Sequence, residues 1–315
     1  MTDKQESQRR TLATLEFTMG QDILHYLQQE NVFELMVNPD GKLWIDTFDK
    51  GRLNTNVIIN PTISQQIIYQ VAALSDQVCT EKTPMLSAEL PDGSRFQGFL
   101  PKVVMAPAFN IRKHSKRVFT LDDYVQNGVM SVNQRLAIVQ AIHAKKNIIA
   151  AGGTKSGKTT LLNAILAEIS KSDDRIVMIE DLPELKCSAA NYLSLRTTDC
   201  VSMDELLRNT LRATPDRIVV GEVRSGEALA LLDAWSTGHN GGASTIHANS
   251  AQHTLLRLQQ LVSRVSINPQ QATIGEAVDV VVYLKLKGTT RYIEEVLAVE
   301  KYDELKKIYI TKKIA

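Results

Sequence analysis

The chain of 315 residues is long enough for two domains, and its 43% hydrophobic and 23% charged residues exclude a mainly disordered protein. The formal net charge of +1 argues against a dedicated nucleic-acid binder, because such domains are strongly basic. The three cysteines, Cys79, Cys187 and Cys200, form no CxxC pair, so we expect a reducing compartment and no structural zinc site.

The chain also lacks the apolar segments of a membrane-inserted protein. Its first ten residues, MTDKQESQRR, are polar and contain no apolar signal core. No run approaches the ~18 apolar residues that cross a bilayer. We therefore expect a cytoplasmic protein whose membrane contact is peripheral or made through partners.

The first domain is expected over residues 1–118 as a small mixed α+β unit. Apolar residues recur at helical spacing in residues 11–30 and again in residues 62–78. Asn60 or Thr62 can cap the second of these helices. These segments give the helical part of the domain.

Two turn signals predict the strands of this domain. They are NPDG at Asn38–Gly41 and LPDG at Leu90–Gly93, each between strand-like runs. Further strands are expected in residues 94–113. The basic segment 113–117 is predicted to be a loop, and residues 119–131 a linker to the second domain.

The second domain is predicted over residues 132–315, where short apolar strands alternate with amphipathic helices. This alternation is typical of a mainly parallel sheet covered by helices, so the fold class is α/β. The predicted elements are a helix at 133–146 capped by Ser131, a strand at 147–152, a helix at 159–170, a strand at 175–180, a helix at 201–213 with a Ser202–Glu205 capping box, a strand at 216–222, a helix at 226–238, a strand at 241–248, a helix at 250–265, and a hairpin with its turn at 287–290.

The segment GGTKSGKTT lies between a predicted strand and a predicted helix and fits the pattern GxxxxGK[ST]. Its glycines let backbone N–H groups turn toward phosphate oxygens, and the helix N-terminus adds its dipole. We expect Lys158 to reach the β- and γ-phosphates and Thr159 to ligate Mg²⁺. The predicted nucleotide-binding residues are Gly152, Gly153, Thr154, Lys155, Ser156, Gly157, Lys158, Thr159 and Thr160.

Acids and histidines at strand ends are candidates for catalysis. Glu222 ends the strand RIVVGE, where a carboxylate can hold the magnesium shell or orient the attacking water. Glu180 and Asp181 end another strand, at the edge where ligands bind in open α/β sheets. His239 and His247 can sense the γ-phosphate or couple it to a neighbouring subunit. The alternative for the acids is an ordinary solvated or helix-capping charge.

Arginines are the remaining candidates. Arg208, Arg212 and Arg224 surround the strand that carries Glu222. Guanidinium groups suit phosphate oxygens and can act across a subunit interface as arginine fingers, so these three are candidate fingers or sensors. The alternative for any one of them is a surface ion pair.

Four blocks stand in one order along the chain: GGTKSGKTT, IEDLPEL, LRNTLRATPDRIVVGEVR and TGHNGGASTIHANSA. Together they resemble the Walker A, Asp box, Walker B and His box of the secretion ATPase superfamily. Within it the likeness is greatest to the TrbB family of conjugal-transfer ATPases, relatives of the traffic ATPases of type IV secretion systems. The segment DGSRFQGFLPKVVMAPAFNIRK is similar to the arginine-bearing segment that ends that family's N-terminal domain. The resemblance covers nearly the whole chain.

The resemblance implies a subunit whose second domain is RecA-like, assembled into a hexameric ring that hydrolyses ATP with Mg²⁺. Such a ring powers conjugative transfer, type IV secretion or pilus assembly from the cytoplasmic face of the inner membrane, docked on inner-membrane components of the channel. Direct nucleic-acid binding is not expected. The implied roles are phosphate and Mg²⁺ binding for Lys158 and Thr159, water activation for Glu222 and Glu180, the His box for His247, and nucleotide contacts for Arg95 and Arg112.

Two positions depart from the family pattern. Lys155 stands where relatives usually have glycine, the residue that takes every backbone geometry freely. Thr214 precedes Pro215 where relatives often carry an arginine, so one candidate phosphate sensor is missing.

Three other functions remain as alternatives. A pilus-retraction motor has a similar pattern, whereas the type II secretion enzymes carry a four-cysteine zinc module that three cysteines cannot form. A DNA-stimulated RecA-like translocase is disfavoured by the neutral charge and by the lack of a basic tract with interleaved aromatic residues. A scaffold ring that binds nucleotide without hydrolysis is disfavoured by Glu180, Glu222 and His247.

Overall fold

The computed structural model describes residues 3–113 and 118–315, and the chain divides into two compact units, residues 1–116 and 117–315. No helix among these described residues has the length and hydropathy of a membrane span. Each unit is built around its own hydrophobic core, and the domain boundary drawn from the sequence stays a prediction.

In the N-terminal unit, six strands of the described residues form one antiparallel sheet in the order β3-β2-β1-β6-β5-β4. The turns at Asn38–Gly41 and Leu90–Gly93 close two of its hairpins, as their sequences predict. The elements are α1 (Asp3–Gln28), β1 (Val32–Val37), β2 (Lys42–Thr47), β3 (Gly51–Ile58), α2 (Pro61–Leu74), β4 (Met85–Glu89), β5 (Arg95–Phe99) and β6 (Ala108–Arg112).

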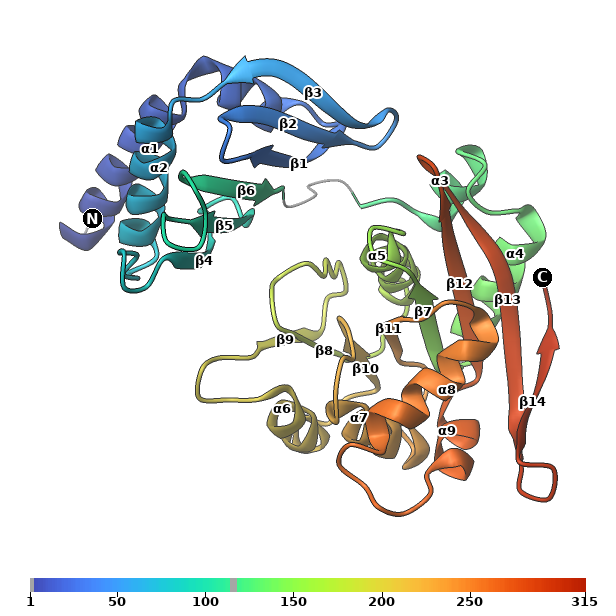
Figure 1. The fold of residues 1–315 in the computed structure, drawn as a ribbon. Coiled ribbons are helices and arrows are strands. Elements are labelled where there is room, and N and C mark those ends of the chain that lie inside the picture. Colours follow the sequence, from blue (N-terminus) through green and yellow to red (C-terminus); the bar gives the residue numbers. More distant parts are fainter. Residues whose placement is uncertain (1–2, 114–117) are drawn as a thin grey trace. The chain divides into compact units, whose positions relative to one another are not determined.

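Helices α1 and α2 lie side by side and pack against this sheet (Figure 1). Leu15 and Ile23 of α1 meet Ile67 and Ile68 of α2 in one buried cluster with residues of the strands. Helix α1 begins before the predicted residue 11, and α2 ends at Leu74, four residues before the predicted end. Of the predicted basic loop at 113–117, residues 114–117 lie outside the described residues.

The C-terminal unit contains the predicted alternation of strands and helices. Its elements are α3 (Leu121–Gln126), α4 (Val132–His143), β7 (Ile148–Gly152), α5 (Lys158–Ile169), β8 (Ile176–Glu180), β9 (Tyr192–Arg196), α6 (Met203–Thr210), the 3₁₀ helix η1 (Leu211–Ala213), β10 (Arg217–Val220), α7 (Glu227–Ser236), β11 (Ala243–His247), α8 (Ala251–Val262), α9 (Gln271–Ala277), β12 (Val280–Lys287), β13 (Thr290–Asp303) and β14 (Ile308–Lys313).

Within residues 118–315, eight strands form a sheet in the order β14-β13-β12-β7-β11-β10-β8-β9. The six strands from β12 to β9 are parallel, and β13 and β14 add an antiparallel hairpin and edge. Because the parallel strands share one direction, their carboxyl ends meet at one edge of the sheet, where ligands bind in folds of this kind. We call it the phosphate edge, since the loop after β7 lies there.

Alternate residues of each central strand enter different cores. In β7, Ile148 and Ala150 pack in a cluster with α3, α4 and α5, whereas Ile149 and Ala151 pack in a cluster with α6, α7, α8 and α9. Helices therefore cover both faces of the sheet, as Figure 1 shows. This two-sided burial fixes the strand ends that carry the candidate site.

The segment 119–131 is more ordered than a linker. Thr120 and Asp123 form a reciprocal capping box at the start of α3, and Leu121, Tyr124 and Met130 are buried in the C-terminal core. This segment is therefore part of the second unit's packing.

Candidate functional site at the phosphate edge

The loop of residues 153–157 joins β7 to α5 with two left-handed residues. Gly157 caps α5 at φ 97°, and Lys155 has φ 61°. Glycine takes this conformation freely, whereas for lysine it costs about 1 kcal/mol. The first N–H groups of α5 have no partner inside the helix, so they suit phosphate oxygens.

Gly152 is required by close packing. It pairs with Leu284 of β12 on one side and with His247 of β11 on the other. A Cβ at this position would lie 2.5 Å from the carbonyl oxygen of Leu284 and 2.6 Å from Ser156 Oγ. Any larger residue would therefore push the loop out of place.

Lys158 at the start of α5 is only 7% exposed. Its ammonium donates to the carbonyl oxygen of Gly153 at 3.0 Å and lies 3.2 and 3.3 Å from the two ring nitrogens of His247. A buried cation whose hydrogen-bond partners are neutral is stabilised when an anionic oxygen binds it. Lys158 therefore suits the phosphate binding predicted for it.

His247, at the end of β11, links Lys158 to Glu222. Burial lowers the pKa of His247, and the Lys158 cation lowers it further, although Glu222 acts in the opposite direction. The imidazole is therefore neutral at neutral pH, and its unprotonated nitrogen can accept from Lys158. Its Nε2 lies 3.1 Å from Glu222 Oε1.

Glu222 follows β10 and has two differently placed carboxylate oxygens. Its Oε2 accepts two N–H groups of Arg224, at 2.6 and 2.9 Å. Its Oε1 is buried and receives no well-directed hydrogen bond from the described residues, despite the nearby ring of His247. Such an oxygen is uncommon in folded proteins, and at this edge it can accept a hydrogen bond from a water molecule.

Arg224 joins the acids of two neighbouring strands. Besides its bonds to Glu222, its Nη1 lies 3.7 Å from Asp181 Oδ2. Its backbone N–H donates to Glu227 Oε1 at 2.6 Å, which fixes the turn before α7. Of the three candidate arginine fingers, Arg224 is the one that the structure places beside Glu222.

Glu180, at the end of β8, is 4% exposed and already engaged. Its Oε2 accepts the backbone N–H groups of Glu184 and Leu185, at 2.8 and 2.9 Å. Burial raises the pKa of Glu180 against the opposing effect of these two bonds. Glu180 therefore shapes the loop after β8, while the neighbouring Asp181 reaches Arg224 and accepts a hydrogen bond from the Thr197 hydroxyl at 3.0 Å.

Three other predicted residues lie on α6, on η1 and in the turn before β11. Arg208 on α6 pairs with Asp204 at 2.8 Å on an exposed surface, and Arg212 lies in η1, just before the amino end of β10. His239 precedes the amino end of β11 in the same way. Arg212 and His239 are thus at the edge opposite the phosphate loop, whereas Arg208 borders a surface pocket with Gly226 and Glu227 at the start of α7.

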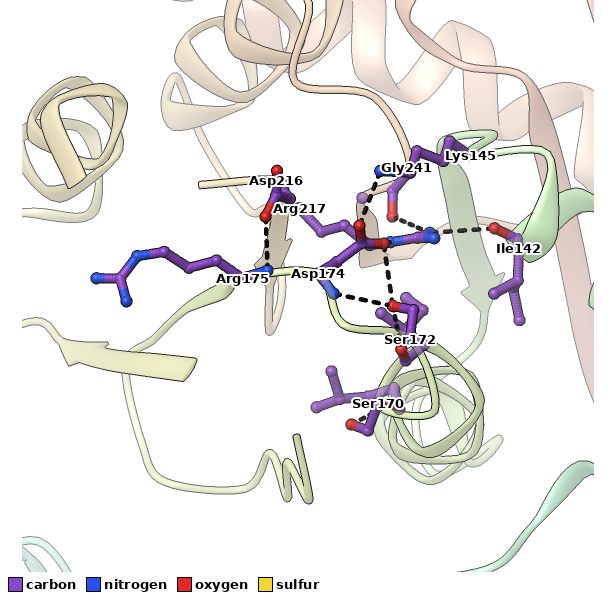
Figure 2. Close-up of polar contacts among 12 residues, drawn as sticks. Ile142, Lys145, Ser170, Ser172, Asp174, Arg175, Asp216, Arg217 and Gly241 are labelled. Carbon is purple, nitrogen blue, oxygen red and sulfur yellow. Dashed lines mark hydrogen bonds and ion pairs between the residues drawn. The ribbon is translucent and has the colours of Figure 1, made fainter. Parts of the chain in front are cut away.

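That opposite edge holds a polar cluster around the buried Arg217, which we call the amino-edge clamp: Arg217, Asp174, Lys145 and the backbone they bind. Arg217 donates to Asp174 at 2.6 Å and to the carbonyl oxygens of Ile142 and Gly241, at 3.1 Å each (Figure 2). Asp174 also accepts from Lys145 at 2.8 Å. Arg217 thus holds the glycine-rich turn before β11 at the amino edge of the sheet. The hydrogen bond to Gly241 gives this turn a structural role there.

Arg95 and Arg112 lie in the N-terminal unit, directly opposite each other in the β5–β6 pair. Glu34 pairs with Arg112 and Glu89 with Arg95, so four charges form one row across the sheet. Each arginine therefore has an acid directly across the sheet from it, and the row of four carries no net charge. The contact of the two arginines with a nucleotide stays a prediction.

One residue of this site was not singled out from the sequence. Arg291 of β13 donates from Nε to the carbonyl oxygen of Lys155, 3.2 Å away, at the centre of the phosphate loop. A Cβ on Gly157 would lie 3.6 Å from its Cδ, so the side chain runs along the loop. No motif marks this arginine, because the contact depends on how the hairpin folds back.

The set of groups fits a nucleotide with Mg²⁺. The loop and the start of α5 can hold phosphate, Thr159 supplies a hydroxyl next to Lys158, and Glu222 Oε1 is a buried acceptor without a hydrogen bond from the described residues.

The family model of the type II/IV secretion system proteins matches residues 18–294. The chain belongs to this family. The conjugal transfer protein TrbB of Rhizobium radiobacter is 44% identical to it over 299 residues, which cover 94% of this chain and 92% of the relative. The probable conjugal transfer protein TrbB of Sinorhizobium fredii is 45% identical over 300 residues, with the same shares covered. The resemblance inferred from the four blocks is therefore confirmed.

Among solved structures, the ATPase DotB of Legionella pneumophila superposes on this member of the type II/IV secretion family with a TM-score of 0.65. The match has 21% sequence identity and covers 90% of this chain and 80% of that one. At this identity the likeness concerns the fold. It confirms the predicted fold class, a small α+β domain followed by a RecA-like domain.

Proposed function

We propose that the chain is one subunit of a hexameric motor that hydrolyses ATP to power conjugative transfer or type IV secretion. The observation that carries the proposal is the contact series from Lys158 through His247 to Glu222, beside the phosphate loop. It joins a phosphate-binding cation to a carboxylate at one edge of the sheet. The two relatives named for conjugal transfer favour that process over pilus assembly or retraction.

In this proposal, residues 152–160 enclose the phosphates of ATP. Lys158 exchanges its bonds to Gly153 and His247 for phosphate oxygens, and Thr159 ligates Mg²⁺. Bound Mg²⁺ supplies charge neutralisation at the phosphates. Glu222 Oε1 accepts a hydrogen bond from the attacking water and orients it toward the γ-phosphate, so that ATP and water yield ADP and phosphate.

The surrounding groups position this acid. Arg224 holds Oε2 of Glu222 and is itself held near Asp181, while Glu180 fixes the loop after β8. With its carboxylate bound to two backbone N–H groups, Glu180 is less suited to activate water than Glu222. The proposal therefore assigns the attacking water to Glu222.

The remaining candidate arginines act in the assembled ring. Arg95 and Arg112 contact the nucleotide from the N-terminal domain, and Arg208 and Arg212 reach toward a neighbouring subunit as candidate fingers. The ring lies on the cytoplasmic face of the inner membrane, bound to inner-membrane components of the channel, and works without binding nucleic acid directly.

The test compares Lys158→Ala and Glu222→Gln with the unchanged protein. We expect both variants to lose turnover of Mg²⁺-ATP by at least about 100-fold, because one removes the phosphate cation and the other the water acceptor. Glu222→Gln keeps nucleotide affinity, since its amide preserves the side-chain shape. Phosphate release measures turnover, and fluorescence anisotropy of a labelled ADP measures binding.

Lys171→Ala is the matched control, because Lys171 is an exposed lysine just beyond the far end of α5. It should retain the turnover of the unchanged protein. A Glu222→Gln variant that no longer binds nucleotide would contradict the assigned role. In the same assay, single-stranded DNA should leave turnover unchanged, and a large, salt-sensitive stimulation would instead favour a translocase.

A further inference from the structure

The hairpin of β12 and β13 reaches the phosphate loop through Arg291. This residue is the second of β13 and pairs with Leu286 of β12. Its Nε donates to the carbonyl oxygen of Lys155 at 3.2 Å. The contact joins residues that are 136 positions apart, and it reaches the backbone of the loop rather than a side chain.

The residue that Arg291 holds is the strained one. Lys155 has φ 61°, in the region that favours glycine. A non-glycine residue keeps such a conformation when the surrounding structure holds it there. The hydrogen bond to the Lys155 carbonyl is a contact that does so from outside the loop.

Arg291 is itself supported on both sides. The next buried residue, Ile293, donates its N–H to the carbonyl oxygen of Val129 at 2.8 Å and accepts from Gln134 Nε2 at 3.1 Å. On the other side, β12 lies directly beside β7, the strand that leads into the loop. The hairpin is therefore tied to β7 on one side and to the segment around the start of α4 on the other.

We propose that Arg291 is a positioning residue that holds the phosphate loop in its anion-binding shape through the Lys155 carbonyl. The inference rests on the proposed nucleotide site and adds a specific support to it. The strained Lys155 makes the loop depend on Arg291, whereas a glycine at that position would remove the dependence. Nucleotide affinity is the property that this support controls.

The test measures binding of labelled ADP with Mg²⁺ to the full chain. We expect Arg291→Ala to weaken binding about tenfold, the effect of one hydrogen bond on the loop, and to change kcat less than KM. Lys285→Ala is the control, because it removes an exposed charge from the same hairpin. An Arg291→Ala variant that binds ADP as tightly as the unchanged protein would overturn the inference.

A second pair of variants separates positioning from general stability. In the Arg291→Ala background, Lys155→Gly should restore most of the lost affinity, because glycine takes the left-handed conformation without support. Lys155→Ala removes the same charge without freeing the backbone, so it should restore none. Equal effects of glycine and alanine would show that the loss does not arise from the loop's conformation.

Hydrogen–deuterium exchange of the peptide that contains residues 153–157 decides the question without nucleotide. Arg291→Ala should raise exchange there, and Lys285→Ala should not. Failure of the unchanged protein to bind ADP would contradict the proposed function alone, since exchange still reports whether Arg291 holds the loop. Unchanged exchange in Arg291→Ala would contradict the inference alone.

Discussion

His247 lies between a cation and an anion, and its protonation state decides which of them it favours. Neutral, it can accept from Lys158, which then stays oriented at the phosphate loop. Protonated, it would repel Lys158 and pair with Glu222 Oε1, 3.1 Å away. The lowered pKa keeps the neutral form dominant under ordinary conditions.

This gives a pH dependence with a defined sign. Because the pKa of His247 lies below its ordinary value of about 6.5, kcat/KM for ATP should be flat above that pH and fall below it. Protonated His247 pairs with Glu222 Oε1, so this oxygen no longer accepts a hydrogen bond from the attacking water. A pH profile of turnover checks this, with His247→Asn as the variant that lacks the titrating group. A fall centred well above pH 6.5 would contradict the prediction.

For single residues, the sequence predicts where a side chain lies when a local motif determines its position. Lys158 and Thr159 follow from the glycine-rich pattern between a strand and a helix, and Glu222 and His247 from their positions at strand ends. Arg291 could not be found in this way, because its partner is 136 positions away and nothing local distinguishes it from other arginines. The unusual Lys155 is visible in the sequence, but what supports it is not.

Among the structural elements, the amino-edge clamp ties together the ends of several segments. Arg217 begins β10 and is nearly fully buried, and Asp174 precedes β8 with 15% of its side chain exposed. The carbonyl groups of Ile142 and Gly241 bring in the end of α4 and the turn before β11. The clamp therefore sets where these elements begin or end.

The clamp predicts how stability depends on pH. Burial acts to raise the pKa of Asp174, but hydrogen bonds from Lys145, Arg217 and Ser172 outweigh it and lower the pKa to about 2. The resulting stabilisation, about 2 kcal/mol, is fully present above the unfolded-state pKa near 4 and is lost as pH falls from there toward 2. Asp174→Asn should therefore lower the free energy of unfolding at neutral pH, and the difference should shrink below about pH 4.

Urea unfolding of the full chain measures this difference. Trp235 is buried in the C-terminal unit, so a Trp44→Phe background leaves a reporter in that unit alone. Asp204→Asn, which breaks an exposed pair on α6, is the control and should have an effect below about 1 kcal/mol. A difference for Asp174→Asn that stays constant down to pH 3 would be inconsistent with the assigned pairing.

Elements with strong periodicity and caps could be predicted, and shorter ones could not. Ser131 and Ser202 cap α4 and α6 as expected. Helix α3 has only six residues and falls within the predicted linker, although its capping pair Thr120 and Asp123 is readable in the sequence. Strand β9 and helix α9 are short as well, and their positions depend on the sheet and core that they join.

For the whole molecule, the sequence predicted two domains of different class, and the family and fold comparisons agree with that class. How the domains act on each other depends on an arrangement that local patterns do not encode. The arginine pair of the N-terminal unit is where this coupling can be tested, because Arg95 and Arg112 are opposed in one sheet.

We expect Arg112→Ala to lower ATP turnover about tenfold or more, because it removes a cation that the proposal places against the nucleotide. Thermal unfolding should be little affected, since Arg112 is exposed. Lys50→Ala, an exposed lysine in the turn between β2 and β3, is the control and should keep full turnover. Size-exclusion chromatography shows whether ring assembly is preserved. Undiminished turnover in Arg112→Ala would contradict a role for this arginine in ATP hydrolysis.

The order of strands in the large sheet has a consequence for biosynthesis. β7 leads into the phosphate loop, yet its two neighbours, β11 and β12, are encoded far downstream. As the chain leaves the ribosome, the N-terminal unit can complete its sheet while β7 still lacks both partners. We therefore expect the nascent chain to complete the proposed nucleotide site late, and a chain cut short before β12 to lack it.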